Sequence, residues 1–394
     1  MRLASSSPRR ARSIPVRLIV ATAAMLATGC GGNSSMKTTL SPQAECVQSP
    51  QPAFAYVLNQ GSFDWGNGTI SSYTVNSCTG SLTPTTPATI ATGSSPEDMA
   101  VDPLGRFVYV ANLVSNAVDN ATISMYTINS RTGVLTPTTP ATVPTGFFPQ
   151  GIGIDPSGKF VYTANSDDNT VSMFTIDSTT GVLTPTRPPA APAGMDPGSV
   201  TVDPSGRFAY VANQGDSTVS MYTIDQTTGV LTPTAPPTTP AGGGPFGVTI
   251  APSGNFAYVP NAYGNNNVSE YNIDSSTGVL TATAEGAAPA GNSPTCVAVN
   301  PSGKFAYVVN RQDNTVSAYT ISSSSGNLSH IGTIATGAQP WRVSADPSGK
   351  FVYVANESGS ISIFALNSDG TLSSAGTVET PSGAFAITVV QARQ

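Results

Sequence analysis

The stretch Asp203-Pro204-Ser205-Gly206-Arg207-Phe208-Ala209-Tyr210-Val211-Ala212-Asn213 recurs in close copies along most of the chain. Its first half has the chemistry of a type I turn, with a side-chain acceptor at Asp203, a preset φ at Pro204 and a flexible exit at Gly206. The apolar run that follows predicts a strand buried on both faces, as expected for a strand between two other layers. The repeating unit is therefore a turn followed by a buried strand.

Seven copies align on the tyrosine that precedes the strand-ending asparagine, at Tyr56, Tyr109, Tyr162, Tyr210, Tyr258, Tyr307 and Tyr353. In the copy around Tyr210, four short strands are predicted at residues 200–202, 208–212, 219–224 and 230–232. The proline-rich stretch after the fourth strand cannot pair as a central strand, so we predict that the fourth strand is the outermost. The strand-ending asparagines tolerate left-handed backbone and can bond neighbouring amides, which predicts a structural role.

The two ends of the array are irregular in a complementary way. The first copy begins directly at its second strand, residues 54–58, and no first strand precedes it. Residues 384–389 follow the last fourth strand and have the pattern of a first strand. A ring that gives its last strand to its first unit explains both irregularities, whereas an open solenoid needs no such exchange.

The repeats resemble those of a known family. Tyr109-Val110-Ala111-Asn112 and its equivalents at Tyr210 and Tyr353, each after Asp-Pro-(Leu/Ser)-Gly-(Arg/Lys)-Phe, are similar to the Tyr-Val-Thr-Asn repeats of seven-bladed β-propellers. These are grouped with the lactonase-like propellers, which include bacterial 6-phosphogluconolactonase and the carboxymuconate cycloisomerases. The resemblance, over roughly residues 51–390, implies an all-β, seven-bladed β-propeller of four-stranded antiparallel blades, closed by the C-terminal strand joining the first blade. It is less specific for function, because related propellers include enzymes, surface proteins and binding modules.

The amino terminus predicts export. Five arginines precede an apolar run at residues 18–27 that is too short to span a bilayer comfortably, which is typical of a signal peptide. The run ends at Cys30 in a sequence that looks like a bacterial lipoprotein cleavage box; the alternative is ordinary cleavage with Cys30 unmodified. The expected organisation is a signal peptide (1–29), a lipidated cysteine with a flexible tether (30–50), the propeller (51–390) and a tail (391–394). We expect a membrane-anchored protein of the bacterial cell envelope, facing the periplasm or the cell surface.

The net charge of the chain restricts the kinds of partner that it is expected to bind. The formal net charge is −6 and becomes −11 without the five arginines of the signal peptide, which argues against a nucleic-acid partner.

Cys46 and Cys78 flank the first strand, and we hypothesise a disulfide that pins the tether to the first repeat. Cys296 lies in an apolar run and is expected to act as a small buried hydrophobe. Metal-ligand spacings and phosphate-binding glycine loops are missing from the sequence, so we expect no metal or other cofactor. A monomer is expected.

The first strands carry the informative differences between repeats, because in such a propeller they line the central channel. Six of them are introduced by a constant Gly-x-x-Pro frame. The residue after the proline varies: it is Glu97, Gln150, Gly198, Phe246, Thr295 and Trp341, with Phe385 in the closing strand. The next residue is Asp98, Gly151, Ser199, Gly247, Cys296 and Arg342, with Ala386 in the closing strand.

These differences predict a site at the channel mouth. Strand direction places both positions on the face of the loops between second and third strands, where Asp64 and Trp65 also lie. We expect Asp64, Trp65, Gln150, Phe246, Trp341 and Phe385 to bind a small molecule or peptide. The alternative is that the channel groups satisfy one another, with Arg342 paired to Glu97 or Asp98.

Three functions remain open. The leading hypothesis is a ligand- or partner-binding module. The resemblance implies the alternative of a lactonase acting on a sugar lactone, with Glu97 or Asp98 as base and Arg342 as electrostatic partner. The carboxymuconate enzymes rely on a channel histidine, and the single histidine here, His330, is predicted at the outer edge. A structural role in the cell envelope is the third hypothesis.

Overall fold

The computed structural model describes residues 46, 49, 51–61, 67–114, 121–381 and 383–391. The predicted signal peptide, Cys30, Asp64 and Trp65 lie outside these residues, as does most of the predicted tether. Within the described ranges the secondary structure consists of 27 strands. In this part of the chain no helix has the length and apolarity needed to cross a membrane.

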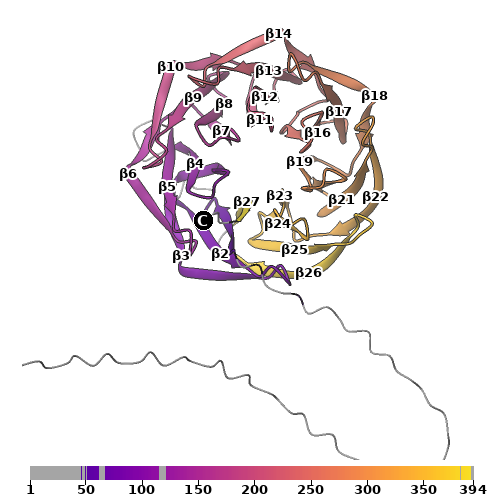
Figure 1. The fold of residues 1–394 in the computed structure, drawn as a ribbon. Coiled ribbons are helices and arrows are strands. Elements are labelled where there is room, and N and C mark those ends of the chain that lie inside the picture. Colours follow the sequence, from indigo (N-terminus) through magenta and orange to yellow (C-terminus); the bar gives the residue numbers. More distant parts are fainter. Residues whose placement is uncertain are drawn as a thin grey trace, which may run out of the picture. The chain divides into compact units, whose positions relative to one another are not determined.

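The strands form seven four-stranded antiparallel blades around a central channel (Figure 1). The long strand β3 (Leu82–Val101) is shared, because its first part ends blade 1 and its last part begins blade 2. The other innermost strands are β7 (Pro149–Ile154), β11 (Pro197–Val202), β15 (Thr249–Ile250), β19 (Pro294–Val299), β23 (Pro340–Ala345) and β27 (Ala384–Gln391). The second strands are β1 (Ala53–Asn59), β4 (Phe107–Val114), β8 (Phe160–Asn165), β12 (Phe208–Asn213), β16 (Phe256–Asn261), β20 (Phe305–Asn310) and β24 (Phe351–Asn356).

The two outer layers complete each blade. The third strands are β2 (Asn67–Val75), β5 (Thr122–Ile128), β9 (Thr170–Ile176), β13 (Thr218–Ile224), β17 (Asn267–Ile273), β21 (Thr315–Ile321) and β25 (Ser360–Leu366). The outermost strands are β6 (Leu135–Pro144), β10 (Leu183–Pro192), β14 (Leu231–Pro240), β18 (Leu280–Pro289), β22 (Leu328–Ala335) and β26 (Leu372–Glu379), with the first part of β3 in blade 1. The predicted seven-bladed, all-β fold is confirmed.

The ring closes through the exchanged strand. β27 pairs antiparallel with β1, with Ala53 opposite Gln391 and Val57 opposite Ile387, and so supplies the innermost strand that the first blade lacks. The C-terminal strand therefore lies beside the N-terminal one, as the irregular ends of the array predict.

One local prediction was wrong in detail. The proline-rich stretch is itself part of the fourth strand, because β14 continues to Pro240 and accommodates the prolines through a register shift opposite β13. Its outermost position explains why missing amide donors are tolerated there.

The structural role predicted for the strand-ending asparagines is confirmed. Asn213 Oδ1 accepts from the Gly194 amide (3.2 Å), and its Nδ2 donates to Thr218 Oγ1 and Ser220 Oγ, both at 2.9 Å. Its backbone is not left-handed.

The Asp-Pro turns have the predicted chemistry. Asp203 is buried, and its Oδ1 accepts hydrogen bonds from the backbone amides of Arg207 (2.9 Å) and Phe208 (2.8 Å). Gly206 has a φ of 72°, the left-handed region that glycine enters without strain. The same bond to the phenylalanine amide is made by Asp102, Asp155 and Asp346, so these turns satisfy their own carboxylates before the second strand begins.

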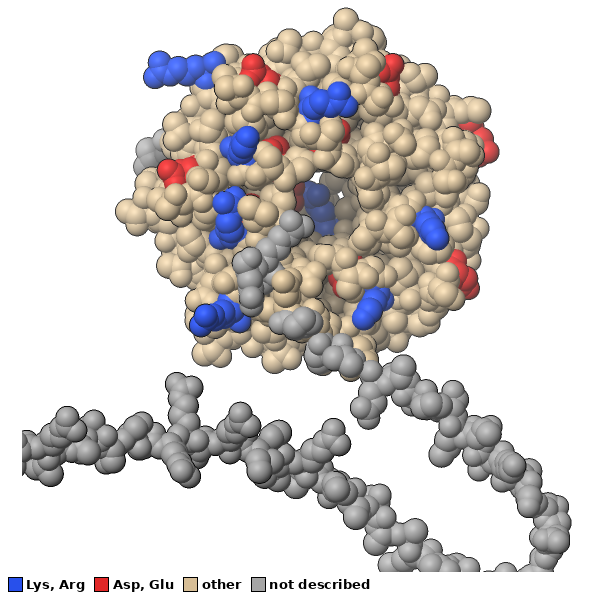
Figure 2. Space-filling model, viewed as in Figure 1, with Lys and Arg blue, Asp and Glu red and all other residues tan. Residues whose placement is uncertain are grey.

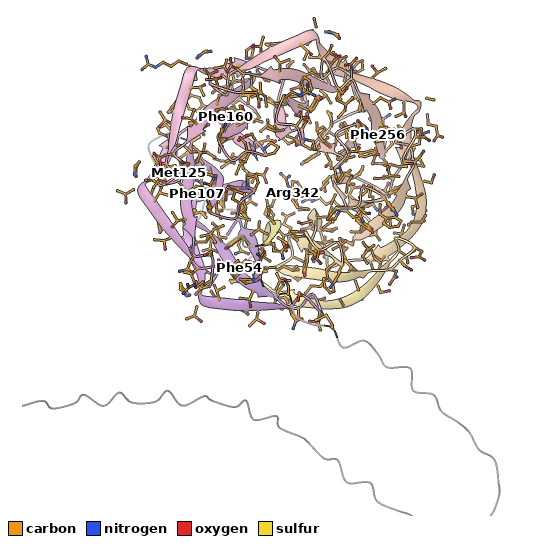
Figure 3. All side chains as sticks on the ribbon, viewed as in Figure 1. Phe54, Phe107, Met125, Phe160, Phe256 and Arg342 are labelled. Carbon is orange, nitrogen blue, oxygen red and sulfur yellow. A yellow bond between two sulfur atoms is a disulfide. The ribbon has the colours of Figure 1, made fainter. Side chains whose placement is uncertain are left out.

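Adjacent blades are joined by one interaction that recurs seven times. The tyrosine of each second strand donates a hydrogen bond of 2.7–3.1 Å to the carbonyl of a glycine in the outer hairpin of the next blade. The pairs are Tyr56–Gly133, Tyr109–Gly181, Tyr162–Gly229, Tyr210–Gly278, Tyr258–Gly326, Tyr307–Gly370 and Tyr353–Gly80. The phenylalanine two residues earlier packs on the same glycine, as Phe160 does on Gly229, and leaves no room for a Cβ. Figure 3 labels four of these phenylalanines, Phe54, Phe107, Phe160 and Phe256.

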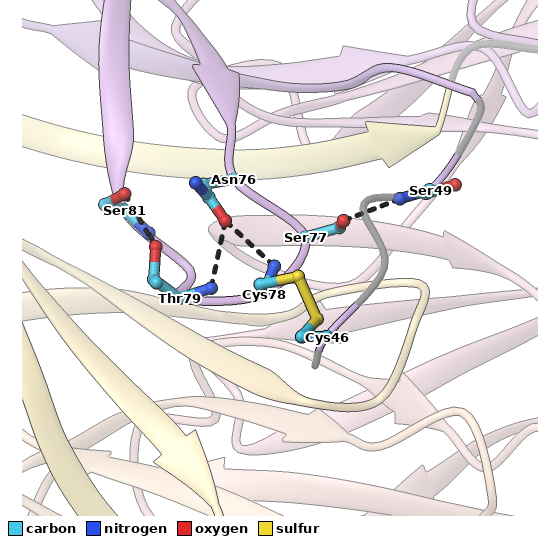
Figure 4. The surroundings of a disulfide bond; sticks show 7 residues. All are labelled: Cys46, Ser49, Asn76, Ser77, Cys78, Thr79 and Ser81. Atoms are coloured by element: carbon cyan, nitrogen blue, oxygen red, sulfur yellow. Dashed lines mark hydrogen bonds between the residues drawn. A yellow bond between two sulfur atoms is a disulfide. The ribbon is translucent and has the colours of Figure 1, made fainter. Parts of the chain in front are cut away.

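A disulfide lies on the hairpin that receives the last of these bonds. Cys46 and Cys78 are bonded, with Cα atoms 5.7 Å apart (Figure 4). The hairpin holds its shape because Asn76 Oδ1 accepts from the amides of Cys78 (2.9 Å) and Thr79 (3.1 Å). The chain before the first strand is therefore tied to the hairpin that contains Gly80, where the ring closes.

We expect Tyr353→Phe to lower the free energy of unfolding by about 1–2 kcal/mol, because the Gly80 carbonyl loses its donor while the ring packing is kept. Urea unfolding followed by circular dichroism measures this change. Tyr263→Phe is the matched control: its side chain is 60% exposed, and the expected change stays within about 0.5 kcal/mol. Equal urea midpoints for Tyr353→Phe and the wild type would contradict the prediction.

One core position departs from the repeat in blade 5. Met125, Met173 and Met221 are fully buried at the same place in β5, β9 and β13, and their sulfur atoms each accept a hydrogen bond from a backbone amide of the next blade. Glu270 takes this place in β17 and is also fully buried. Its Oε1 accepts from the Leu328 amide (2.7 Å) and its Oε2 from Thr283 Oγ1 (3.2 Å). Burial raises the pKa of Glu270 despite these two bonds.

Glu270→Met should therefore stabilise the protein increasingly as the pH rises from 4 to 8. The folded pKa lies above the unfolded value, so the folded state holds the Glu270 proton more tightly and loses stability as the pH rises through the folded pKa. We expect a gain of roughly 1 kcal/mol at pH 8 and little gain at pH 4, measured by urea unfolding at each pH. Glu379→Gln, at an exposed position, should show no such trend; a pH-independent effect of Glu270→Met would contradict the assignment.

Candidate functional site

Five of the inner strands begin with a bulge that sets the direction of the variable side chains. In blade 2, Pro96 pairs with Asn112 and Asp98 with Ala111, so Glu97 between them has no partner in the ladder. The same shift follows the first proline of β7, β11, β19 and β23. Bulges are common where a side chain must be re-aimed. The position after the proline is therefore the unpaired residue of a bulge in these five blades.

The Gly-x-x-Pro frame before the bulge is held by the strand-ending asparagine. The Gly93 amide donates to Asn112 Oδ1 (3.1 Å), and a Cβ on Gly93 would come within 2.6 Å of the Asn112 side chain. Gly194 donates in the same way to Asn213 (3.2 Å). The constant frame of the repeat thus fixes the start of the strand that carries the variable residues.

An ion pair crosses the closure of the ring. Arg342 Nη2 on β23 lies 3.2 Å from Asp98 Oδ2 on β3, and the strand between them, β27, has only Ala386 at the equivalent position. Asp98 also accepts from the amides of Met99 (2.9 Å) and Ile152 (3.2 Å). Burial raises the pKa of Asp98, while the charge of Arg342 and the two amides act in the opposite direction. Figure 3 labels Arg342 within the central channel.

Glu97 is the second carboxylate at this place, and its environment differs from that of Asp98. It is half-buried, and its Oε1 accepts a hydrogen bond from Gln60 Nε2 (2.7 Å). Burial raises the pKa of Glu97 to about 7, and the negative charge of Asp98 acts in the same direction. The hydrogen bond from Gln60 acts in the opposite direction and lowers this pKa. Glu97 can therefore exchange a proton near neutral pH, whereas Asp98 is occupied by Arg342 and two amides.

The aromatic residues of the predicted site pack on one another. Trp341 stacks on Phe385, with ring centroids 4.7 Å apart, and meets the edge of Phe246 at 5.3 Å. The Arg311 guanidinium lies 4.5 Å from the Trp341 ring centroid and is bonded to Glu357 (2.6 Å). The three aromatic residues thus form one braced cluster that spans several blades.

Other predicted residues lie elsewhere or have other partners. Gln150 donates to Ser166 Oγ (3.3 Å) and accepts from Gln214 (3.2 Å). These hydrogen bonds do not involve the aromatic cluster. His330 lies on the outermost strand β22, exposed and edge-on to Tyr319, as predicted. Among the described residues, no group of three or more His, Cys, Asp or Glu side chains is arranged to hold a metal ion.

A cavity of about 250 Å³ lies in the channel. Its lining includes Asp98 and Arg342 but none of the predicted ligand-binding residues that the structure describes. Ser199 and Cys296 line it as well. Cys296 differs from the expectation of a fully buried hydrophobe, because it is half-buried and faces the cavity as a free thiol. The position two after the proline thus supplies most of this part of the wall, and of the described residues directly after the proline only Thr295 lines the cavity.

The sequence comparison missed a third variable position. The residue after each strand-ending asparagine is Gln60, Leu113, Ser166, Gln214, Ala262, Arg311 or Glu357. Four of these contact predicted site residues: Gln60 bonds Glu97, Ser166 and Gln214 bond Gln150, and Arg311 lies on Trp341. Glu357 is paired with Arg311. The same internal alignment contains this signal, because the residue after a constant asparagine varies as strongly as the two positions after the constant proline.

Positive charge surrounds the opening on one face. Figure 2 shows Lys and Arg side chains spaced around the central opening and one in its depth. In the sequence, Arg106, Lys159, Arg207 and Lys350 end Asp-Pro turns, and Lys304 ends the equivalent Asn300-Pro301 turn. Arg106 and Arg207 also donate to carbonyls of the neighbouring blades, at Ser178 (3.2 Å) and Ser275 (2.7 Å). None of these five cations lines the cavity.

Comparison with known proteins supports the fold and adds a family. Residues 189–388 match the family model described as "Lactonase, 7-bladed beta-propeller", and residues 34–250 match "SMP-30/Gluconolactonase/LRE-like region". No curated protein matches the chain.

Solved structures resemble the chain over most of its length. A protein from Bacteroides fragilis assigned as a 6-phosphogluconolactonase has a TM-score of 0.73 and 21% identity, with 86% of this chain and 98% of that chain covered. A similarly assigned protein from Bacteroides uniformis has a TM-score of 0.73 and 20% identity, with coverages of 87% and 100%. The periplasmic gluconolactonase of Pseudomonas aeruginosa has a TM-score of 0.69 and 21% identity, with coverages of 85% and 99%. At 20–21% sequence identity, these likenesses show a shared fold and nothing more specific.

Proposed function

Because the chain belongs to the family of seven-bladed propeller lactonases, we propose that it hydrolyses the lactone of a sugar acid in its central channel. The observation that carries this proposal is the Asp98–Arg342 ion pair at the cavity wall, with Glu97 next to Asp98 in the chain. The family match favours this activity over the ligand-binding module that the sequence suggested first.

Each of the three residues has a separate role in the proposed reaction. Burial raises the pKa of Glu97 to about 7. Glu97 takes a proton from a water molecule while the oxygen of that water molecule forms a bond to the lactone carbonyl carbon. Arg342 stabilises the negative charge that develops on the carbonyl oxygen. Asp98 acts as a positioning residue, because it holds the guanidinium across the gap left by Ala386.

Ring opening completes the reaction. The carbon–oxygen bond of the lactone ring breaks, and the leaving alkoxide receives the proton held by Glu97. The product is the open-chain hydroxy acid, whose carboxyl group ionises and releases one proton to the solvent. A single carboxyl group can serve both steps because its pKa is close to the working pH.

Lactonase activity should follow the ionisation of Glu97. Below about pH 7, kcat/KM for gluconolactone should fall about tenfold per pH unit, because a general base must be ionised to act. Glu97→Gln should lower kcat by roughly 10²–10⁴-fold, measured as proton release in a pH-stat after subtraction of spontaneous hydrolysis. Asp98→Asn should shift the acidic limb to lower pH, because the negative charge of Asp98 raises the Glu97 pKa.

Glu285→Gln is the matched control, since Glu285 is exposed on the outermost strand β18 and its substitution should leave the acidic limb of the profile in place. Full turnover by Glu97→Gln would refute the assignment of the base. Ligand binding without turnover of any lactone would favour the binding module instead.

We also propose that the protein is exported and anchored through lipid on Cys30. The arginines and the apolar run before Cys30 support export, and the Cys46–Cys78 disulfide is typical of an oxidising compartment. Cys30→Ser should move the protein from the membrane fraction to the soluble envelope fraction, assayed by fractionation and immunoblotting. An unchanged distribution would contradict the anchor.

A further inference from the structure

Ser199 has a buried hydroxyl group with no use in the fold. The residue is 5% exposed, and its Oγ has no hydrogen-bond partner among the described residues. It lies on β11 at the cavity wall. Buried hydroxyl groups are nearly always bonded, so an unpaired one at a cavity indicates a group that meets a ligand.

The space in front of Ser199 exists because Gly247 of the next blade lacks a side chain. The equivalent positions of the two flanking blades are Gly151 and Gly247. Glycine at 151 lets the two inner strands approach closely, because a Cβ there would come within 2.6 Å of the Ser199 backbone. A Cβ on Gly247 would lie 3.4 Å from Ser199 Oγ, and Gly247 has no positive φ that would require glycine. The absent side chain of Gly247, which lines the cavity, leaves the hydroxyl facing open space.

Further hydroxyl groups line the same cavity. Thr201, Thr249, Ser344 and Thr388 stand two residues after the Ser199 position on their strands. Thr201 Oγ1 donates to the Val248 carbonyl (2.6 Å) and Thr249 Oγ1 to the Val297 carbonyl (2.7 Å). Since each donor proton is used in these bonds, the lone pairs of both oxygens remain to accept from a ligand. The wall therefore offers acceptors as well as the free Ser199 hydroxyl.

Charge in the cavity is confined to one place. Among the described residues that line it, Arg342 is the only cation, and Asp98 already pairs with it. A phosphate dianion would need cations or several free amide donors at its own position. The volume of about 250 Å³ lies just below the roughly 300–1,000 Å³ of common small-molecule pockets. The cavity therefore suits a small ligand that is rich in hydroxyl groups.

We propose that Ser199, Thr201, Thr249, Ser344 and Thr388 form a polyol subsite that binds the unphosphorylated carbon chain of a sugar acid or its lactone. This inference rests on the proposed function in one respect, the placement of the lactone carbonyl at Arg342. Ser199 is the specificity-determining member, because its hydroxyl can donate to one ligand oxygen and accept from another. A site built to bond a hydroxyl group discriminates strongly against a ligand that lacks it.

Isothermal titration calorimetry with gluconate and 6-phosphogluconate on the purified protein tests the subsite without requiring catalysis. The wild type should bind gluconate at least as tightly as 6-phosphogluconate. Ser199→Ala should weaken gluconate binding about tenfold, which corresponds to one lost hydrogen bond. Gly247→Ala should also weaken it, because the added methyl group fills the space in front of Ser199. Ser368→Ala, on an exposed turn, is the control and should bind as the wild type does.

Thermal unfolding separates this role from a structural one. Ser199→Ala removes a hydroxyl group that bonds to nothing in the described protein, so its Tm should equal or exceed that of the wild type. The proposal is overturned by a clear fall in Tm, by unchanged gluconate affinity in Ser199→Ala, by tighter binding of 6-phosphogluconate, or by absence of gluconate binding to the wild type.

The two proposals can fail separately. Gluconate binding that Ser199→Ala weakens, without hydrolysis of any lactone, would refute the lactonase and leave the subsite standing. Hydrolysis of gluconolactone with an unchanged KM in Ser199→Ala would support the lactonase and overturn the subsite.

Discussion

The bond from a second-strand tyrosine to the hairpin glycine of the next blade is the constraint on which the molecule depends. Its partners are far apart in sequence but always one blade apart in space, so it fixes each blade relative to the next. Phe160 on Gly229 shows why the contact tolerates little change: the ring occupies the place of a Cβ, and the glycine has a φ of 74°. Seven equivalent hydrogen bonds between blades leave each blade little freedom to tilt. The bond that closes the ring, from Tyr353 to the Gly80 carbonyl, has the same geometry as the others at 2.8 Å.

That rigidity permits variation at the channel. Asn112 and Gly93 of the preceding frame fix the start of an inner strand, so the two residues that follow the proline can differ from blade to blade. Small residues at the second of these positions, such as Gly247 and Ala386, leave open the space that Arg342 and Ser199 face. The site is therefore a set of departures from a repeat whose other positions keep the ring intact.

The fold could be predicted from the sequence because each repeat carries local sequence signals for its strands and turns. The Asp-Pro turn, the apolar strand and the hairpin glycine each act within a few residues, and their repetition made the number of blades certain. An ion pair of Arg342 with a carboxylate beside the closure, Glu97 or Asp98, could be predicted from strand direction, and the structure has it at Asp98. The cavity could not, because it depends on side chains that are absent, at Gly247 and Ala386, and on which of two adjacent positions the bulge turns inward. The contact of Arg311 with Trp341 was not predicted because Arg311 occupies the variable position after the strand-ending asparagine, which is far from Trp341 in sequence.

The exchanged strand has a consequence for the order in which the protein is made. The first blade contains the earliest strand of the ring and also the last, so residues 53–59 keep an unpaired inner edge until residues 384–391 have been synthesised. An unpaired strand edge is a template for wrong pairing with another chain. Blades 2 to 7 can assemble as they emerge, but the ring cannot close before the end of translation or export. Protection of the waiting edge by a chaperone would matter most in that interval, and a chain cut short before β27 would retain a ring that cannot close.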